Sequence, residues 1–426
     1  MASDPNDPDF SENQFAMPRP SAEVERPEAD SSIRVGREGR EFCIYPAQLG
    51  YDLQEELDFL SNRVMEPNVF FTGRLLAPAM PRIEDRSVRF ALMRDENGRR
   101  SRMRFLMPFT IEKPGFSVGP SILRAWANPF GPLGTPLVDS EGAAETIDNL
   151  LDALMQPELR LPSVLVLPLV RLNGPFVRMI RAVALSRNLP VSMAERHRRH
   201  LLQNGPDADI YLQNKLSFDD RNLLKAKWSD LQALGTVSYN VARQAGDVRM
   251  RMEEFLALEA NGTKGRKRNA LVTDRYRTAF AREAINNLAE IDAARIHTVD
   301  LNGEAIASVV ILMAMGEAYI WKAAFNERYA NYMPERLLTQ RLTEWQLDDA
   351  NIICTDSCVV EEELSLTGLW DDAAEMGTLV VGLSQNSDRD VRQVATQVHM
   401  YRNTRNLAKA LRERIMSLGR KGGAAT

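Results

Sequence analysis

Apolar side chains follow helical spacing in some segments of the chain and strand spacing in others. Residues 52–64 repeat apolar side chains every three or four positions, as an amphipathic helix does, whereas residues 87–93 alternate as a strand does. Asn97-Gly98 follows, a pair favoured in tight hairpin turns. Strands interleaved with helices predict a mixed α/β fold for the first half of the chain.

The second half repeats this plan with different residues. Two helical segments, 250–261 and 274–289, precede a predicted strand at 295–301. Asn302-Gly303 is then a second hairpin turn. The recurrence predicts two α/β units in tandem.

Composition separates a tail from these two units. Residues 1–38 are rich in Pro, Ser, Asp and Glu and poor in large apolar side chains, so burial cannot offset the entropy lost on ordering. We therefore expect a disordered tail that serves as a flexible tether or as a docking segment for a partner. An N-terminal unit at 39–215 and a C-terminal unit at 216–426 follow, each predicted to be a mixed twisted sheet flanked by helices.

The charge of the chain is concentrated in the tail. The 426 residues carry a net charge of −5, and residues 1–38 hold nine acidic side chains against four arginines. The remaining 49 acidic and 49 basic side chains balance. A neutral folded region argues against a general nucleic-acid binder, and so against DNA as a partner.

Targeting and metal signals are missing from the sequence. No segment is apolar over the roughly 20 residues that cross a bilayer, and the first residues lack the pattern of a signal peptide. The sequence therefore predicts a cytoplasmic protein without membrane insertion. Three cysteines and four histidines show no spacing typical of a disulfide framework or a metal site.

Short motifs in the second half follow one another in a characteristic order: Phe255–Glu259, Gly262–Gly265, Leu301–Ala307, Tyr319–Ala330 and Pro334–Leu338. In this order they resemble the acyltransferase domain of the CelD-type cellulose-biosynthesis proteins. That family belongs to the GNAT superfamily of N-acetyltransferases and is similar to the Fem-type aminoacyl transferases, which carry two such folds in tandem. The resemblance implies two tandem GNAT-like folds in this chain.

The resemblance also implies an activity. The chain would be an acyltransferase that uses acetyl-coenzyme A or another acyl-coenzyme A as co-substrate and no metal. Its acceptor would be an amine or hydroxyl of a small molecule or glycan precursor. Cell-surface polysaccharide synthesis, of cellulose for example, would be the setting, with polysaccharide-synthesis proteins as partners.

Two motifs depart from the family pattern. Gly262-Thr-Lys-Gly265 stands where the family has Gly-Trp-Lys-Gly, and Met333-Pro-Glu335 stands where it has Ser-Pro-Gly. These departures leave two alternatives open. One is a catalytically silent GNAT-fold module that binds partners in a polysaccharide-synthesis complex. The other is a Fem-like transferase that uses an aminoacyl-tRNA donor.

The donor site implied by the resemblance lies at the start of a helix. In GNAT enzymes the pyrophosphate of coenzyme A sits on backbone N–H groups at a glycine-rich turn between a strand and a helix. The equivalent connection here, residues 325–336, contains no glycine. Pro334 as first helical residue leaves the N–H groups of Glu335, Arg336 and Leu337 available, so we expect these four residues to bind the donor. Arg336 favours a phosphate and Glu335 opposes one; an ordinary helix start is the alternative.

Acceptor-binding residues are expected at and near the predicted strand 318–325. Its alternation places Lys322 on the face of Ile320, and Tyr319 on the opposite face. A lysine on an apolar face needs a partner or a cleft. We therefore predict that Lys322, Tyr319 and the loop residue Lys264 bind the acceptor. The alternatives are a lysine that reaches solvent from an edge, a core tyrosine and a solvated loop lysine.

Asp356 is the predicted catalytic residue. It follows a predicted strand at 351–355, and α/β proteins often place ligands at such strand ends. A carboxylate there is suited to act as the general base for an amine nucleophile. Capping of a helix or a turn by Asp356 is the alternative.

Overall fold

The computed structural model of the chain describes residues 27–83, 87–97, 100–115, 119–205, 207–359, 366 and 368–401. The strands are β1 (Ser31–Arg34), β2 (Arg40–Pro46), β3 (Arg89–Asn97), β4 (Arg100–Glu112), β5 (Ile122–Ala125), β6 (Leu137–Val138), β7 (Val164–Arg171), β8 (Val191–Gln203), β9 (Val237–Ala242), β10 (Ala294–Leu301), β11 (Glu304–Ala314), β12 (Glu317–Phe325), β13 (Cys354–Asp356) and β14 (Asp372–Gly382).

The α-helices are α1 (Gln54–Ser61), α2 (Gly73–Ile83), α3 (Ala143–Leu154), α4 (Pro175–Ser186), α5 (Ala208–Lys215), α6 (Phe218–Gln232), α7 (Ala245–Asn261), α8 (Thr263–Arg266), α9 (Arg275–Ala289) and α10 (Pro334–Asp348). A last helix is described at 388–401. Two of the 3₁₀ helices are η2 (Val69–Phe71) and η5 (Glu327–Tyr332).

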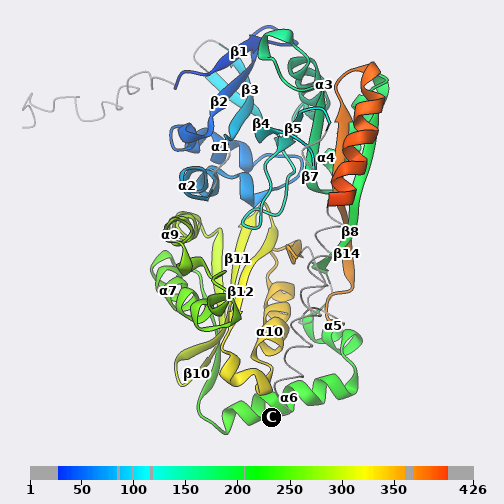
Figure 1. Ribbon diagram of the computed structural model, residues 1–426. Helices are drawn as coiled ribbons and strands as arrows, with labels where there is room; N and C mark the ends of the chain where they lie inside the picture. The colour runs from blue at the N-terminus through cyan, green and yellow to red at the C-terminus, as the bar shows by residue number, and fades with distance from the viewer. Residues whose placement is uncertain are drawn as a thin grey trace, which may run out of the picture.

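The strands form one continuous sheet through both halves of the molecule (Figure 1). Its order is β1-β2-β3-β4-β5-β7-β14-β8-β13-β12-β11-β10-β9, and β6 pairs with β4. β5–β7 and β12–β13 are parallel pairs among antiparallel ones. The mixed α/β class predicted from the sequence is therefore confirmed.

The two halves exchange their last strands. β8, which ends the first series of elements, pairs with β13 of the second half, and β14 pairs with both β7 and β8. The helix at 388–401 then packs on this part of the sheet through Val391 and Val394. The predicted C-terminal unit, residues 216–426, therefore includes one strand, β14, that lies in the sheet of the first half.

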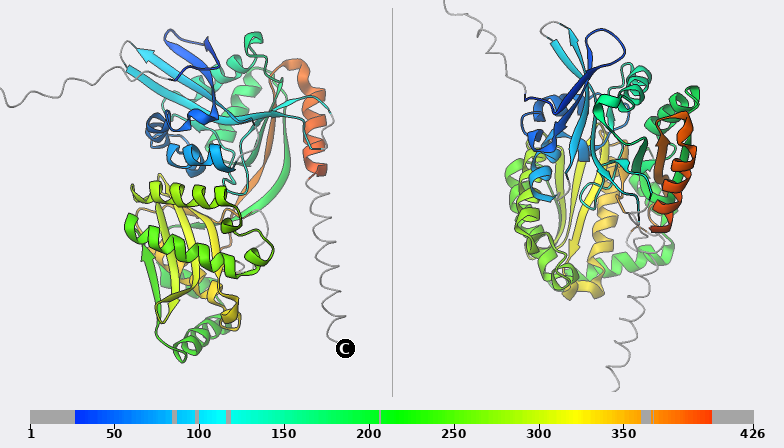
Figure 2. Two further views of the ribbon diagram at one scale, coloured as in Figure 1. Left: turned by 60° about the vertical axis from the view of Figure 1, so that its left-hand side comes forward. Right: turned by 45° about the horizontal axis from the view of Figure 1, so that its top comes forward.

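Helices cover both faces of the sheet (Figures 1 and 2). α1, α2, α7 and α9 lie on one face over a single apolar core that contains side chains of both halves, such as Leu76 and Phe280. α3 and α4 cover the other face of the first half, and α5, α6 and α10 that of the second. The shared core makes the two halves one packed body.

Local signals in the sequence place several elements well. The turn between β10 and β11 has φ angles of 53° at Asn302 and 85° at Gly303, the left-handed values that a two-residue hairpin turn requires. α10 begins at Pro334, as predicted. The prediction of a disordered segment extends too far, because β1 at 31–34 pairs with β2 and Ile33 packs on the core. Residues 1–26 and 402–426 lie outside the described residues.

Candidate functional site

A cavity opens where β12 and β13 separate. The two strands pair in parallel only as far as Tyr319 and Asp356. β12 continues to Phe325, whereas the chain after β13 turns away at Cys358, whose φ is 54°. Along this stretch of β12, the described residues place no further strand beside the edge that faces the cavity. The cavity of about 420 Å³ is lined by β12, by α10 through Glu335, and by residues 357–359 and 258–264.

Lys264 reaches into this cavity from α8, the short helix that follows α7. Its Nζ donates to the carbonyl oxygen of Ala323 in β12 at 3.0 Å and lies 3.4 Å from the carboxylate of Glu259. Gly265 allows α8 to lie this close to the end of α7, because a Cβ there would lie 1.7 Å from the carbonyl oxygen of Ala260. Lys264, predicted in a loop, thus lies in a short helix and is held against the strand by its surroundings.

Lys322 lines the same cavity, but on a different face of β12 from the one predicted. A bulge in the β11–β12 pairing makes Val310 pair with Lys322 and Ile311 with Ile320, so Trp321 is the extra residue. The alternation therefore shifts at this point, and Lys322 lies with Trp321 rather than with Ile320. The predicted face was wrong because a bulge depends on the partner strand, which a single strand's pattern does not show.

Residues of the first half contact Lys322 directly. The Lys322 ammonium donates to the carbonyl oxygen of Pro129 at 3.3 Å and lies 4.9 Å from the centre of the Phe130 ring. Trp321 Nε1 donates to the carbonyl oxygen of Phe130 at 2.9 Å. Burial, followed by the neighbouring charge of Lys264, lowers the pKa of Lys322 to about 8. The sequence did not predict that the turn at residues 128–131, which carries Pro129 and Phe130, belongs to the site, because only the tertiary fold brings this turn to β12.

The start of α10 forms another side of the cavity. Met333 has a left-handed φ of 54° and Pro334 occupies the first helical position. The N–H of Leu337 donates to the carbonyl oxygen of Met333 at 3.0 Å, so it is not available to a donor, contrary to the expectation above. The side chain of Leu337 is buried in the core beneath. Glu335 lines the cavity, and the N–H groups of Glu335 and Arg336 precede the first bond of the helix.

Asp356 and Tyr319 do not line the cavity; they belong to a buried polar cluster at the junction of the halves. Asp356 accepts hydrogen bonds from Arg171 at 3.1 Å and from the N–H of Cys358 at 2.7 Å. Burial alone would raise the pKa of Asp356, but Arg199 and Arg171 outweigh it and hold this pKa below its ordinary value. The carboxylate is therefore a weak base that fixes the turn at Cys358.

Tyr319 is fully buried in this cluster. Its hydroxyl lies 2.9 Å from the Glu317 carboxylate and 3.1 Å from the carbonyl oxygen of Pro67 in the first half. The Tyr319 ring packs edge-on against Phe70 of η2, with ring centres 5.7 Å apart. Burial raises its pKa well above the ordinary value. The structure thus brings Lys264, Lys322 and Glu335 to one cavity and places Tyr319 and Asp356 behind it.

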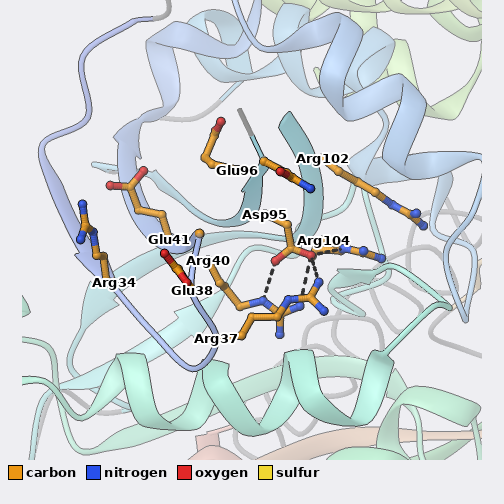
Figure 3. Close-up of a pocket in the computed structure, with 11 residues that line it drawn as sticks. Arg34, Arg37, Glu38, Arg40, Glu41, Asp95, Glu96, Arg102 and Arg104 are labelled. Atoms are coloured by element: carbon orange, nitrogen blue, oxygen red, sulfur yellow. Dashed lines mark hydrogen bonds and ion pairs between the residues drawn. The ribbon is translucent and has the colours of Figure 1, made fainter. Parts of the chain in front are cut away.

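A second cavity of about 1040 Å³ lies in the first half, between the β1–β2 and β3–β4 hairpins (Figure 3). Arg37, Arg40 and Arg104 converge there on the carboxylate of Asp95. Burial would raise the pKa of Asp95, but these hydrogen-bonded guanidinium groups lower it overall. The arginines are already paired, so the arrangement is an ion network that braces the two hairpins.

Comparison with known proteins finds a family match in the second half of the chain. Residues 219–354 match the family described as the acetyltransferase (GNAT) domain, the CelD-type family, in agreement with the resemblance seen in the sequence. No curated protein sequence matches the chain. Among the described residues, none of the helices is both long enough and apolar enough to cross a bilayer.

Solved structures show the fold. FemX aligns with a TM-score of 0.51 at 9% identity, over 77% of this chain and 95% of that chain. The C-terminal domain of a putative lysylphosphatidylglycerol synthetase from Agrobacterium fabrum aligns with a TM-score of 0.49 at 12% identity, over 82% and 96%. A tandem GNAT protein from the clavulanic acid biosynthesis pathway aligns with a TM-score of 0.37 at 10% identity, over 81% and 99%. The chain thus has a mixed α/β fold similar to that of FemX, and residues 219–354 match the acetyltransferase (GNAT) domain family.

Proposed function

We propose that the chain is an acyltransferase that moves an acyl group from an acyl-coenzyme A to an amine or hydroxyl acceptor in the cavity between β12 and β13. The observation that supports this is the separation of the two strands beyond Tyr319 and Asp356. It leaves the backbone N–H and C=O groups along one edge of β12 beside the cavity. An extended, amide-bearing thioester arm is able to bind such an edge as an added strand does.

The surrounding residues suit the two ends of this donor. At one end the start of α10 would carry the phosphates, with Arg336 as their cation and Pro334, Glu335 and Leu337 shaping the turn. At the other end the thioester carbonyl would lie along the unpaired edge of β12, where backbone N–H groups favour the oxyanion that forms as the acceptor attacks. Direct attack on the thioester needs no covalent enzyme intermediate: the C–N or C–O bond forms, the C–S bond breaks, and the acceptor's proton passes to the coenzyme A thiolate that leaves.

Asp356 enters the proposal as a positioning residue rather than as a base in contact with the acceptor. Its carboxylate holds the N–H of Cys358, and Cys358 lines the cavity. Loss of the carboxylate would release this turn and widen the cavity. We therefore propose that substitution of Asp356 lowers turnover through the shape of the site.

The acceptor class follows from the resemblance. We propose a small molecule or glycan precursor that bears an amine or hydroxyl, in the synthesis of a cell-surface polysaccharide such as cellulose and in company with polysaccharide-synthesis proteins. The cytoplasm, where acyl-coenzyme A is made, is the proposed location. Lys264 and Lys322 would face this acceptor across the cavity.

Thermal unfolding with and without acetyl-coenzyme A or free coenzyme A tests the donor. A ligand at a hundredfold over its Kd stabilises by about 2.7 kcal/mol, and each kcal/mol raises Tm by roughly 2–4 °C in domains of 150–250 residues. Arg336→Ala should reduce this shift. Arg341→Ala, which alters the same helix outside this cavity, should leave it unchanged. An unshifted wild-type Tm would contradict acyl-coenzyme A as donor.

One feature favours a different donor. The connection between β12 and α10 has no glycine, and it places Glu335 where a pyrophosphate would bind. Aminoacyl-tRNA, which carries its acyl group on an ester, is the second candidate, and a gel shift with aminoacylated tRNA at physiological salt tests it. Failure of both donors, with stable partners captured by Lys264 and Lys322 variants, would indicate a silent binding module.

A further inference from the structure

The two faces of β12 point toward different parts of the molecule. Ile320, Ala323 and Phe325 pack toward α10 and the core beneath it. Trp321 and Ala324 face the opposite core, which contains α7, α9 and Phe130. Because of the bulge, Lys322 lies on this second face. The helix start proposed for the donor and the ammonium of Lys322 are therefore on opposite faces of the strand.

Three cations gather on the face away from α10. The guanidinium of Arg277, in the first turn of α9, lies 5.6 Å from the centre of the Phe130 ring, and the Lys322 ammonium lies 4.9 Å from the same centre. Lys264 enters from α8. The charges of Lys264 and Arg277 lower the pKa of Lys322, after the larger effect of burial, and the carboxylate of Glu259 raises it. The positions of the nearby carboxylates therefore decide whether the positive charge is balanced.

The carboxylates near these cations do not neutralise Lys322. Glu259 lies 3.4 Å from Lys264 and also accepts the N–H of Leu271 at 2.7 Å. Asp274 lies 3.8 Å from Arg277. Within the described part of the chain, Lys322 has no carboxylate within 4.0 Å and donates to a carbonyl oxygen instead. A partly buried cation in this state is suited to bind an anion.

The turn at 128–131 gives this group a fixed wall. The side-chain oxygen of Asn128 accepts the N–H of Phe130 at 2.7 Å and that of Gly131 at 3.0 Å. The bond from Trp321 Nε1 to the carbonyl oxygen of Phe130 then ties the turn to β12. The first half thus fixes one side of Lys322, away from the helix start proposed for the donor.

We infer that the acceptor carries an anionic group, a carboxylate or a phosphate, which binds to Lys322 and Arg277 beside the Phe130 ring. This inference rests on the proposed function, because it names the chemistry of the acceptor at the same cavity. The anion would hold the far end of the acceptor and leave its amine or hydroxyl at the edge of β12, next to the thioester. Lys264 would contribute charge from α8.

Binding of small anions to the full chain tests this inference without coenzyme A. Thermal unfolding and calorimetric titration are run with inorganic phosphate and, separately, with acetate, and sodium chloride keeps the ionic strength constant. We expect saturable binding of at least one of the two anions, and the stronger one identifies the anionic group. Lys322→Met and Arg277→Gln should each weaken this binding at least tenfold. Equal responses to chloride, phosphate and acetate would overturn the inference.

Arg275→Gln is the matched control. Arg275 is two residues from Arg277 in α9, is exposed and stacks on Tyr276 instead of Phe130. Its substitution removes the same net charge and should leave anion binding unchanged. If Arg275→Gln weakened binding as much as Arg277→Gln, the effect would be one of general charge and the inference would fail. Anion binding without coenzyme A binding would overturn the proposed donor and leave the anion site standing.

Discussion

Arg171 and Glu317 form a bidentate ion pair across the junction of the two halves. Nη1 and Nη2 of Arg171, at the end of β7, donate to the two carboxylate oxygens of Glu317, at the start of β12, at 2.9 and 2.7 Å. Nη2 of Arg171 also donates to Asp356. The first half is therefore bonded directly to the strand that lines the cavity, which couples the stability of the junction to the geometry of the site.

Removal of one partner of this pair should destabilise the protein strongly. Arg171→Met leaves Glu317 without its cation and Asp356 with Arg199 alone, and breaking a buried pair costs about 3–5 kcal/mol. Denaturant unfolding measures the loss. Arg243→Met is the control, because the Arg243–Asp292 pair is exposed and such pairs contribute about 0–1 kcal/mol. Similar losses of unfolding free energy in the two variants would show that the junction pair stabilises the protein no more than an exposed pair does.

Asp356→Asn should show a pH-dependent loss of stability. The pKa of the folded-state carboxyl is lowered from 3.8, so ionised Asp356 stabilises the folded protein at all pH values above about 3.8. Unfolding at pH 7 should therefore show the full deficit of the variant. The deficit should shrink as the pH falls below 3.8 and wild-type Asp356 takes up a proton. A deficit that is constant from pH 7 to below 3 would contradict the ion-paired state.

Features that depend on neighbouring residues were predictable from the sequence, whereas features that depend on distant partners were not. The Asn302-Gly303 turn and the start of α10 at Pro334 follow from backbone preferences of those residues. Lys264 and Lys322, which line the cavity, were predicted as site residues because the short motifs that contain them both lie in the second half of the chain.

The remaining parts of the site come from long-range pairing. The bulge at Trp321 depends on the register between β11 and β12, and it reversed the predicted face of Lys322. The turn that carries Phe130 reaches β12 from 191 positions away. Arg171 and Glu317 have no local signal, because their burial and pairing arise only when β7 meets β12.

Lys322→Met should stabilise the free protein at neutral pH. Burial and neighbouring cations lower the Lys322 pKa from 10.5 to about 8, so the folded state holds the charged lysine at a cost below pH 8. Methionine removes this cost. As the pH rises from 8 toward 10.5, the folded wild-type protein loses the proton first, and its stability rises toward that of the variant. Denaturant unfolding at pH 7 and at pH 10 measures the difference in unfolding free energy between the variant and the wild type. A variant that is less stable than the wild type at pH 7 would contradict an unbalanced charge on Lys322.

Glu335→Gln should strengthen the binding of acyl-coenzyme A. Glu335 occupies the second position of α10 and lines the cavity, where its negative charge opposes the phosphates of the donor. Neutralising it removes this repulsion, and we expect a Kd about three- to tenfold lower, equivalent to roughly 0.7–1.4 kcal/mol at 1.4 kcal/mol per factor of ten. The helix itself should lose about 0.3–1 kcal/mol, since a carboxylate in the first turn favours the helix dipole. Calorimetric titration with coenzyme A measures the affinity, with Glu344→Gln further along α10 as control. A Kd that is unchanged in Glu335→Gln, or lowered equally in both variants, would mean that the phosphates do not bind at the start of α10.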